Sequence, residues 1–154
     1  MKIFIAGDHG GFTLKNEIIK ELAEFNFTDL GPQELHLDDD YPDFAKILCD
    51  RLLQEPGLTG ILICKSGIGM SIAANKFKGI YAALCFTPEH AKKAREHNNA
   101  NVLCLDSEYG LLKNHLEIVN AFLQTEFAGW ETRHGRRVKK VFEIEEGQEK
   151  AIKG

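Results

Sequence analysis

Short runs of mostly apolar residues alternate along the chain with longer amphipathic stretches. Residues 2–6, 60–64 and 101–105 are the clearest runs, because they are apolar at nearly every position. A strand that is apolar on both sides suits a parallel sheet with both faces covered. Weaker candidates for strands lie near 27–30 and over 80–86. The alternation predicts an α/β fold: a three-layer, doubly wound, Rossmann-like parallel sheet of about five strands with helices on both faces.

The stretches between these runs carry signals for helices. After the first run, apolar residues recur at helical spacing among charged residues such as Lys15, at Leu14, Ile18, Leu22 and Phe25. Thr87-Pro88-Glu89 predicts a helix start, because it supplies a hydroxyl N-cap, a first-turn proline and a carboxylate at the positive end of the dipole. We expect this helix to end near 97–99, where asparagine tolerates left-handed backbone. Further helices are predicted to begin around Pro42 and to cover 68–76, 111–126 and 136–150.

The length and charge of the chain narrow the class of partner. A chain of 154 residues has the size of one domain, and we treat residues 1–154 as one unit. Its 19 basic and 23 acidic residues give a formal net charge of -4, which argues against nucleic-acid binding and a polybasic membrane anchor. No stretch approaches the roughly twenty apolar residues that span a bilayer. We therefore expect a small-molecule partner.

The cysteines predict neither a disulfide framework nor a metal site. The chain has four, at Cys49, Cys64, Cys85 and Cys104, with no C-x-x-C pair and no Cys/His ligand spacing. Met1-Lys2 leads directly into the first apolar run, which is too short for a signal-peptide core. These features predict reduced thiols and a cytoplasmic protein.

Cys64 is the cysteine whose position in the sequence favours a reactive thiol. In doubly wound sheets ligands bind beyond the carboxyl ends of the strands, and Cys64 ends a predicted strand just ahead of Ser66, Gly67 and Gly69. A thiol before a glycine loop and a helix N-terminus is favoured as thiolate, so it can act as a base or nucleophile. The glycines let backbone N–H groups approach an oxyanion, and Ser66 adds a donor. The other three cysteines fit helix or strand patterns and are expected to be inert core residues.

Other polar residues fall at the ends of predicted elements, and each has a plainer alternative. Asp8-His9 follows the first strand and suits a sugar hydroxyl and a phosphate, although a turn aspartate and a solvated histidine also fit. His97 lies near a helix C-terminus, where the dipole favours the protonated ring of a proton donor, or simply a cap. We interpret His36, His90 and His115 as surface residues. The run 38–40 of three aspartates is interpreted as a flexible acidic loop rather than a metal site.

The densest basic cluster lies near the C-terminus, at Arg133, His134, Arg136 and Arg137. Arg133 and Arg137 face the same side of a helix if that helix begins early enough, and a guanidinium fork matches a phosphate dianion. A solvated basic face is the plainer alternative.

Five blocks of sequence together resemble ribose-5-phosphate isomerase type B and the related galactose-6-phosphate isomerase subunits. They are IAGDHGG (5–11), DYPDFA (40–45), ILICKSGIGMSIAANK (61–76), EHNNANVL (96–103) and RHGRRV (133–138). They occur in order over nearly the whole chain. The resemblance implies a homodimer, sometimes paired into tetramers, with active sites built from two subunits. It also implies isomerisation of a sugar phosphate without a metal or organic cofactor. The helical segment from about 136 is expected to pack on the partner subunit.

The resemblance also implies roles for single residues. Cys64 is similar to the base that moves a proton between C1 and C2, and the loop of Ser66, Gly67 and Gly69 to the one that stabilises the enediolate. His97 is similar to the residue that opens the sugar ring, with Asp8 and Asn98 near the ring hydroxyls. The positions similar to phosphate or substrate contacts are His9, Lys65, Ile68, Arg133 and Arg137.

Several positions depart from the family pattern. Lys65 replaces a usual glycine, and Glu108 replaces a usual phosphate-contacting arginine, where a carboxylate would repel a dianion. Asn99 replaces a common aspartate, and residues 130–132 lengthen the segment before Arg133. The first substrate to expect is ribose 5-phosphate, converted to ribulose 5-phosphate. The alternatives are a hexose 6-phosphate of the galactose or allose type, a cysteine phosphocarrier, and a catalytically silent sugar-phosphate sensor.

Overall fold

The computed structural model describes the backbone of residues 2–153 and side chains through residue 147. Five strands form one parallel sheet in the order β2-β1-β3-β5-β4. The strands are β1 (Lys2–Gly7), β2 (Asn26–Asp29), β3 (Thr59–Cys64), β4 (Ala82–Leu84) and β5 (Val102–Asp106). The helices are α1 (Phe12–Glu21), α2 (Tyr41–Gln54), α3 (Ile68–Ala74), α4 (Pro88–Asn98), α5 (Leu112–Gln124) and α6 (Arg133–Lys153). The predicted doubly wound parallel sheet is confirmed.

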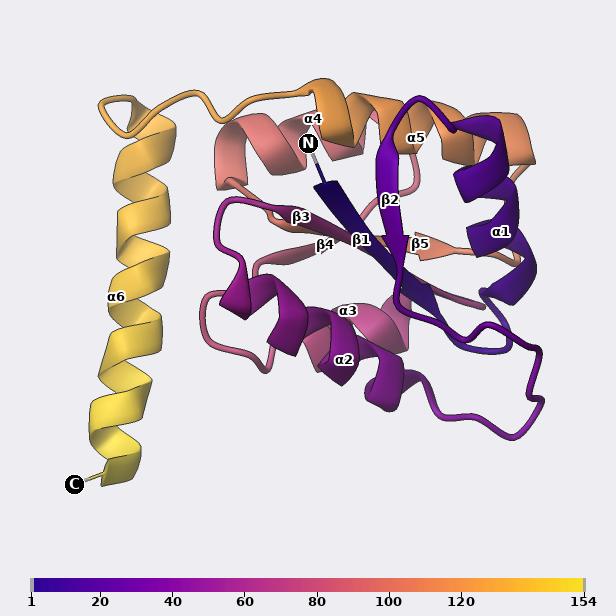
Figure 1. Cartoon of the computed structure of the whole chain (residues 1–154). Helices are drawn as coiled ribbons and strands as arrows, with labels where there is room; N and C mark the ends of the chain where they lie inside the picture. The colour runs from indigo at the N-terminus through magenta and orange to yellow at the C-terminus, as the bar shows by residue number, and fades with distance from the viewer. Residues whose placement is uncertain (1, 154) are drawn as a thin grey trace.

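Helices cover both faces of the sheet, which gives the three layers (Figure 1). Successive side chains of a strand point to opposite faces. Ile3 and Ile5 of β1 accordingly pack in one core with α1, α4 and α5. Phe4 and Ala6 pack in the other core with α2 and α3. The central strand β3 is buried along its whole length, which explains why residues 60–64 are apolar on both faces of the sheet.

Some element boundaries differ from the sequence prediction. The first helix stops at Glu21, because Leu22 leaves helical geometry and caps it. Strand β4 has three of the seven predicted residues, since it is the outermost strand of the sheet and pairs only with β5. The last helix begins at Arg133 rather than near 136, because the Thr132 hydroxyl accepts a hydrogen bond from the Gly135 N–H at 3.2 Å and caps the helix. Asn99 ends α4 in the left-handed region, as predicted.

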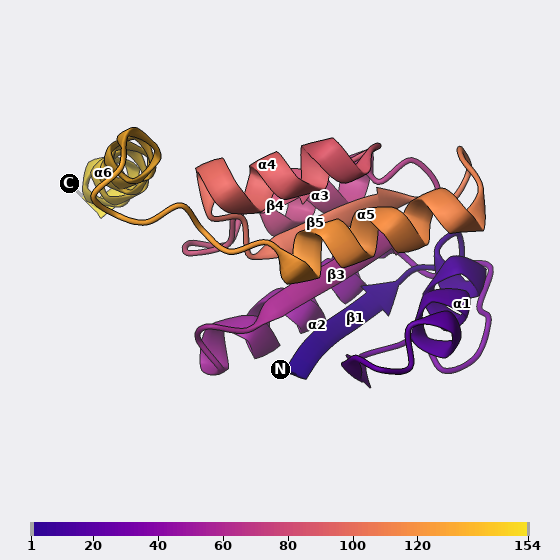
Figure 2. The same cartoon turned by 90° about the horizontal axis from the view of Figure 1, so that it is seen from above.

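Helix α6 lies beside the body of the protein and joins it through an extended segment (Figures 1 and 2). Glu145 fixes its position, because its carboxylate accepts hydrogen bonds from the Gly79 N–H at 3.0 Å and the Tyr81 hydroxyl at 2.9 Å. The rings of Tyr81 and Phe142 pack 5.1 Å apart. Within residues 2–153, none of the helices has the length and apolar content needed to cross a bilayer.

Two charged or titratable side chains expected on helix surfaces are buried. Lys15 is fully buried and donates to Asp29 at 2.6 Å and to the Pro32 carbonyl at 2.9 Å. These bonds tie α1 to the end of β2 and compensate the buried charge. His115 is 3% exposed and lies 3.8 Å from the buried Asp106. The interpretation of His115 as a surface residue is therefore wrong.

Candidate active site

The loops that follow β1, β3 and β5 meet at the carboxyl edge of the sheet. The Asp8 N–H donates to the Ile63 carbonyl at 3.2 Å, and the Ser107 N–H donates to the Cys64 carbonyl at 3.0 Å. The Ser107 hydroxyl also donates to the Gly10 carbonyl at 2.6 Å. Strand order reverses between β1 and β3, so this edge is the switch point at which doubly wound sheets bind ligands.

Glycine is required where the β1 loop approaches β3. A Cβ atom on Gly11 would lie 2.2 Å from the Ile63 carbonyl oxygen, so no larger residue fits without moving backbone. Gly67, in the loop after β3, has a φ of 71°, a conformation that other residues rarely adopt. The two loops therefore hold their polar groups at fixed separation.

Cys64 lies at the end of β3, in the loop junction itself. Its sulfur accepts a hydrogen bond from the Gly67 N–H at 3.1 Å, and the residue is 5% exposed. A donated hydrogen bond stabilises negative charge on the acceptor. Burial raises the pKa of Cys49 to about 12 and that of Cys85 to about 11. Burial also raises the pKa of Cys104. These three are buried and unpaired, as predicted for inert core residues.

The loop after Cys64 supplies hydrogen-bond donors. The Ser66 hydroxyl oxygen accepts from the Ile68 N–H at 3.3 Å, which leaves its own proton for a ligand. The Gly69 N–H lies in the first turn of α3, where backbone donors have no partner within the helix. A Cβ on Gly69 would lie 2.7 Å from the Tyr41 ring, so this glycine allows α3 to pack on α2. Lys65 and Ile68 are exposed at the same rim.

Asp8 and His9 stand at the end of β1 beside this loop. Asp8 is 6% exposed and its carboxylate accepts from the Gly11 N–H at 3.0 Å. Burial is the main reason that the pKa of Asp8 is raised. His9 is held by Asp39, whose carboxylate lies 2.7 Å from Nδ1. The interpretation of residues 38–40 as a flexible acidic loop is therefore wrong for Asp39.

Asp8, His9 and Asp39 also form the one group of possible metal ligands found among the described residues, with ligand atoms within 4.8 Å of one another. The Asp8 and Asp39 carboxylates already accept hydrogen bonds from Gly11 and His9. The contacts therefore describe a hydrogen-bonded charge cluster.

A second group of predicted residues lies on α4 and α6. The rings of His97 and His134 stack with their centroids 4.0 Å apart and their planes 3° apart. Loss of hydration, followed by the nearby charge of His97, lowers the pKa of His134. Arg133 and Arg137 are exposed one turn apart on α6. Asn98 and Arg137 line the same cavity of about 290 Å³. His134 belongs to the basic cluster of the sequence, but its stacking on His97 has no local sequence signal.

The two groups lie at opposite edges of the sheet. Helix α4 starts just after β4, at the carboxyl edge, and ends just before β5 begins, at the amino edge. At 1.5 Å per residue its 11 residues span about 16 Å. A single chain therefore brings Cys64, Ser66, Asp8 and His9 together, and it brings His97, Asn98, Arg133 and Arg137 together. It does not unite the two groups.

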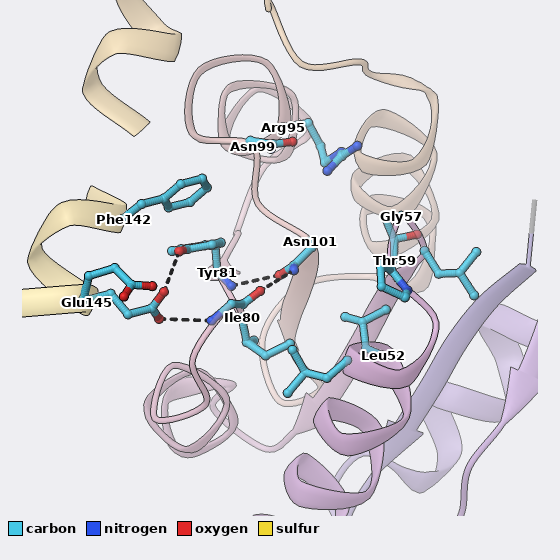
Figure 3. A pocket seen from close by; sticks show the side chains of 15 residues that line it. Leu52, Gly57, Thr59, Ile80, Tyr81, Arg95, Asn99, Asn101, Phe142 and Glu145 are labelled. Atoms are coloured by element: carbon cyan, nitrogen blue, oxygen red, sulfur yellow. Dashed lines mark hydrogen bonds between the residues drawn. The ribbon is translucent and has the colours of Figure 1, made fainter. Parts of the chain in front are cut away.

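A cavity of about 440 Å³ lies at the amino edge between α6 and the body (Figure 3). Tyr81, Asn101, Phe142 and Glu145 line it, and the bonds from Gly79 and Tyr81 to Glu145 close one side. None of the catalytic, substrate-binding or phosphate-binding residues expected from the sequence lines this cavity. This cavity lies where α6 contacts the body of the protein, and the candidate site residues lie elsewhere.

A sequence profile described as Ribose/Galactose Isomerase matches residues 3–141. The chain belongs to this family. It is 46% identical over 145 residues to a probable ribose-5-phosphate isomerase B of Mycoplasma pneumoniae, covering 93% of this chain and 94% of the relative.

Solved structures of family members have the same fold. Ribose-5-phosphate isomerase B of Mycoplasma genitalium, with bound ribulose-5-phosphate, superposes with a TM-score of 0.88 at 44% identity, over 94% of this chain and 96% of that one. The Clostridium thermocellum enzyme superposes with a TM-score of 0.90 at 41% identity, over 96% and 99% of the two chains. The fold thus agrees with the resemblance.

Proposed function

We propose that the chain interconverts ribose 5-phosphate and ribulose 5-phosphate. The observation that carries this proposal is the Cys64 sulfur at the switch point of the sheet, hydrogen-bonded by a loop that offers further donors. Support comes from family relatives of similar length, one of which has ribulose-5-phosphate bound. We expect no metal or organic cofactor to take part.

Aldose–ketose isomerisation needs a base beside C2 and donors where negative charge develops. We assign Cys64 as the base that takes the C2 proton and returns it to C1. The Ser66 hydroxyl and the Gly69 N–H donate to the oxygens of the enediolate. His97 transfers the proton that opens the ring, and Asp8 and Asn98 bind ring hydroxyls. His9, Arg133 and Arg137 bind the phosphate, which keeps the open chain in register.

We further propose that each active site combines two copies of the chain. The assigned base and the assigned ring-opening histidine lie at opposite sheet edges of one chain, so a homodimer is the simplest way to bring them together. Exposed apolar side chains support an interface: Ile68 and Ile72 on α3 are 54% and 58% exposed, and Ile144 on α6 is 62% exposed. In this arrangement α6 packs on the partner subunit. We also propose a cytoplasmic location, which the four unpaired cysteines support.

A hexose 6-phosphate is the second candidate substrate, and Glu108 is the observation that favours it. Its N–H donates to the Lys65 carbonyl at 3.1 Å, so these two departures from the family pattern adjoin at the rim of the site. The Glu108 carboxylate disfavours a phosphate close by, whereas the Lys65 ammonium favours one. The balance of these charges decides how far from the base a phosphate binds.

The direct test is an isomerisation assay with ribose 5-phosphate, allose 6-phosphate and galactose 6-phosphate. We expect the ribose substrate to give the largest kcat/KM, and its product formed in D₂O to carry deuterium at C1. Turnover of a hexose phosphate alone would keep the reaction class and overturn the substrate. Absence of turnover with all three would overturn the proposed function.

A further inference from the structure

Asp39 stands out from the loop that carries it. Every residue from 33 to 40 is exposed except Asp39, whose side chain is 12% exposed. It lies against His9, which is 30 positions earlier in the chain. An acidic side chain turned inward from an otherwise solvated loop needs a partner that compensates its charge.

His9 supplies that partner through two bonds to one oxygen. The His9 backbone N–H donates to Asp39 Oδ1 at 2.9 Å, and the ring Nδ1 lies 2.7 Å from the same oxygen. The other oxygen of Asp39 is buried and has no hydrogen-bond partner within the described part of the chain. Together these contacts fix both the backbone and the ring orientation of His9.

The contact also fixes which ring nitrogen carries hydrogen. Because a carboxylate only accepts, Nδ1 must be the protonated nitrogen in either charge state of the ring. Among residues 2–147 the structure records no hydrogen bond to Nε2. Nε2 therefore presents a lone pair when His9 is neutral, and becomes a donor only when His9 is an imidazolium.

We propose that Asp39 is a positioning residue that keeps His9 an imidazolium with its Nε2–H available to the substrate phosphate. This inference rests on the proposed function, in which His9 binds phosphate. A phosphate dianion gains a charge-assisted hydrogen bond from an imidazolium and is repelled by the lone pair of the neutral ring. Asp39 thereby extends phosphate binding to higher pH.

The charged groups around His9 agree with this assignment. The hydrogen bond to Asp39 is the largest cause of the raised pKa of His9, and the charge of Asp8 adds to it. Lys65, from the loop after β3, acts in the opposite direction. Removal of the Asp39 charge leaves Asp8 and Lys65 to oppose each other, so the pKa of His9 falls.

The first test is independent of catalysis. The imidazole of His9 is titrated by NMR in the full-length protein and in Asp39→Asn, with Asp38→Asn as the control because Asp38 is exposed on the same loop. We expect the titration midpoint of His9 to fall in Asp39→Asn and to stay in place in Asp38→Asn. Inorganic phosphate is expected to shift the His9 signals less in Asp39→Asn at pH 8. Equal midpoints in the two variants would overturn the proposal.

The second test uses the KM for ribose 5-phosphate across pH. The ratio of the Asp39→Asn KM to the wild-type KM is expected to be about tenfold at pH 8 and to approach one near pH 6, with kcat nearly unchanged. A ratio independent of pH, or a loss confined to kcat, would overturn the assigned role. If the wild type does not isomerise ribose 5-phosphate, the proposed function fails while the NMR titration still decides the Asp39–His9 coupling. Asp39→Ser, a smaller neutral acceptor, replaces the asparagine variant if that variant does not fold.

Discussion

The carboxyl edge of the sheet and the α4–α6 region carry the two groups of candidate site residues, and they are built differently. At the carboxyl edge, backbone hydrogen bonds link the loops after β1, β3 and β5, and Asp8 and Cys64 are buried. On α4 and α6, Arg133 and Arg137 are exposed on one helix, and His97 is supported mainly by the stacked ring of His134. Contacts within one chain fix the loops at the carboxyl edge, whereas Arg133 and Arg137 on α6 are exposed to solvent.

This difference in construction corresponds to the different roles assigned to Cys64 and to Arg137. Proton transfer at carbon depends on sub-ångström placement of a base and of oxyanion donors, which tightly linked loops provide. Binding of a phosphate dianion depends on charge, which exposed arginines provide once a ligand or partner covers them. Variants of Cys64 are therefore expected to lower kcat, and variants of Arg137 to raise KM.

The largest effect is expected at Cys64. Cys64→Ala removes the assigned base and should lower kcat by about 10²–10⁴-fold, the usual contribution of a positioned acid–base group. Its circular dichroism and thermal unfolding should remain those of a folded protein. Cys85→Ala, another buried cysteine, serves as the control and should keep the wild-type kcat. Full activity of Cys64→Ala would contradict the assignment of Cys64 as the base that transfers the proton.

A smaller effect is expected at Arg137. Arg137→Ala should raise the KM for ribose 5-phosphate by about 10- to 100-fold with a minor change in kcat, because a charge-assisted bidentate contact is lost. Steady-state kinetics measures both constants. The neighbouring Arg136 side chain points to a different side of α6, so Arg136→Ala should change the KM for ribose 5-phosphate little. A pure kcat effect at Arg137 would contradict its assignment to phosphate binding.

The smallest effect is expected at Asp8, and it concerns stability. Burial raises the folded-state pKa of Asp8, so the folded protein holds its proton more tightly than the unfolded chain and loses stability as pH rises through that pKa. Asp8→Asn keeps an acceptor for the Gly11 N–H without the buried charge. We expect its Tm at pH 7 to exceed that of the wild type by a few degrees, a difference that vanishes in acid where Asp8 is protonated. A lower Tm of Asp8→Asn at pH 7 would show that the carboxylate is fully compensated.

Local patterns predicted most of the fold. The apolar runs identified β1, β3 and β5 because buried parallel strands are apolar on both faces. Thr87 and Asn99 predicted the ends of α4 because caps act within one turn. Thr132 carries the same kind of signal for the start of α6, and it places that start at Arg133 rather than near 136.

Contacts between distant residues could not be predicted in this way. Asp39 reaches His9 across 30 residues, and His115 is buried beside Asp106 because α5 packs on the sheet. Lys15 is buried because Asp29 and Pro32 meet it from the end of β2. For the site, strand ends indicated Cys64 and Asp8, since the carboxyl edge follows from topology. The separation of His97 from Cys64 became visible only once α4 was placed along the sheet.

Subunit complementation tests the central claim, that each active site takes its base from one copy and its phosphate-binding arginines from another. Cys64→Ala and Arg137→Ala are each assayed at low substrate, where both are nearly inactive, then mixed, dissociated and reassociated. A mixed dimer contains one site with both residues intact, so random reassociation should restore about one quarter of the wild-type activity. Activity that stays at the level of the separate variants, although mass spectrometry shows mixed dimers, would contradict the account.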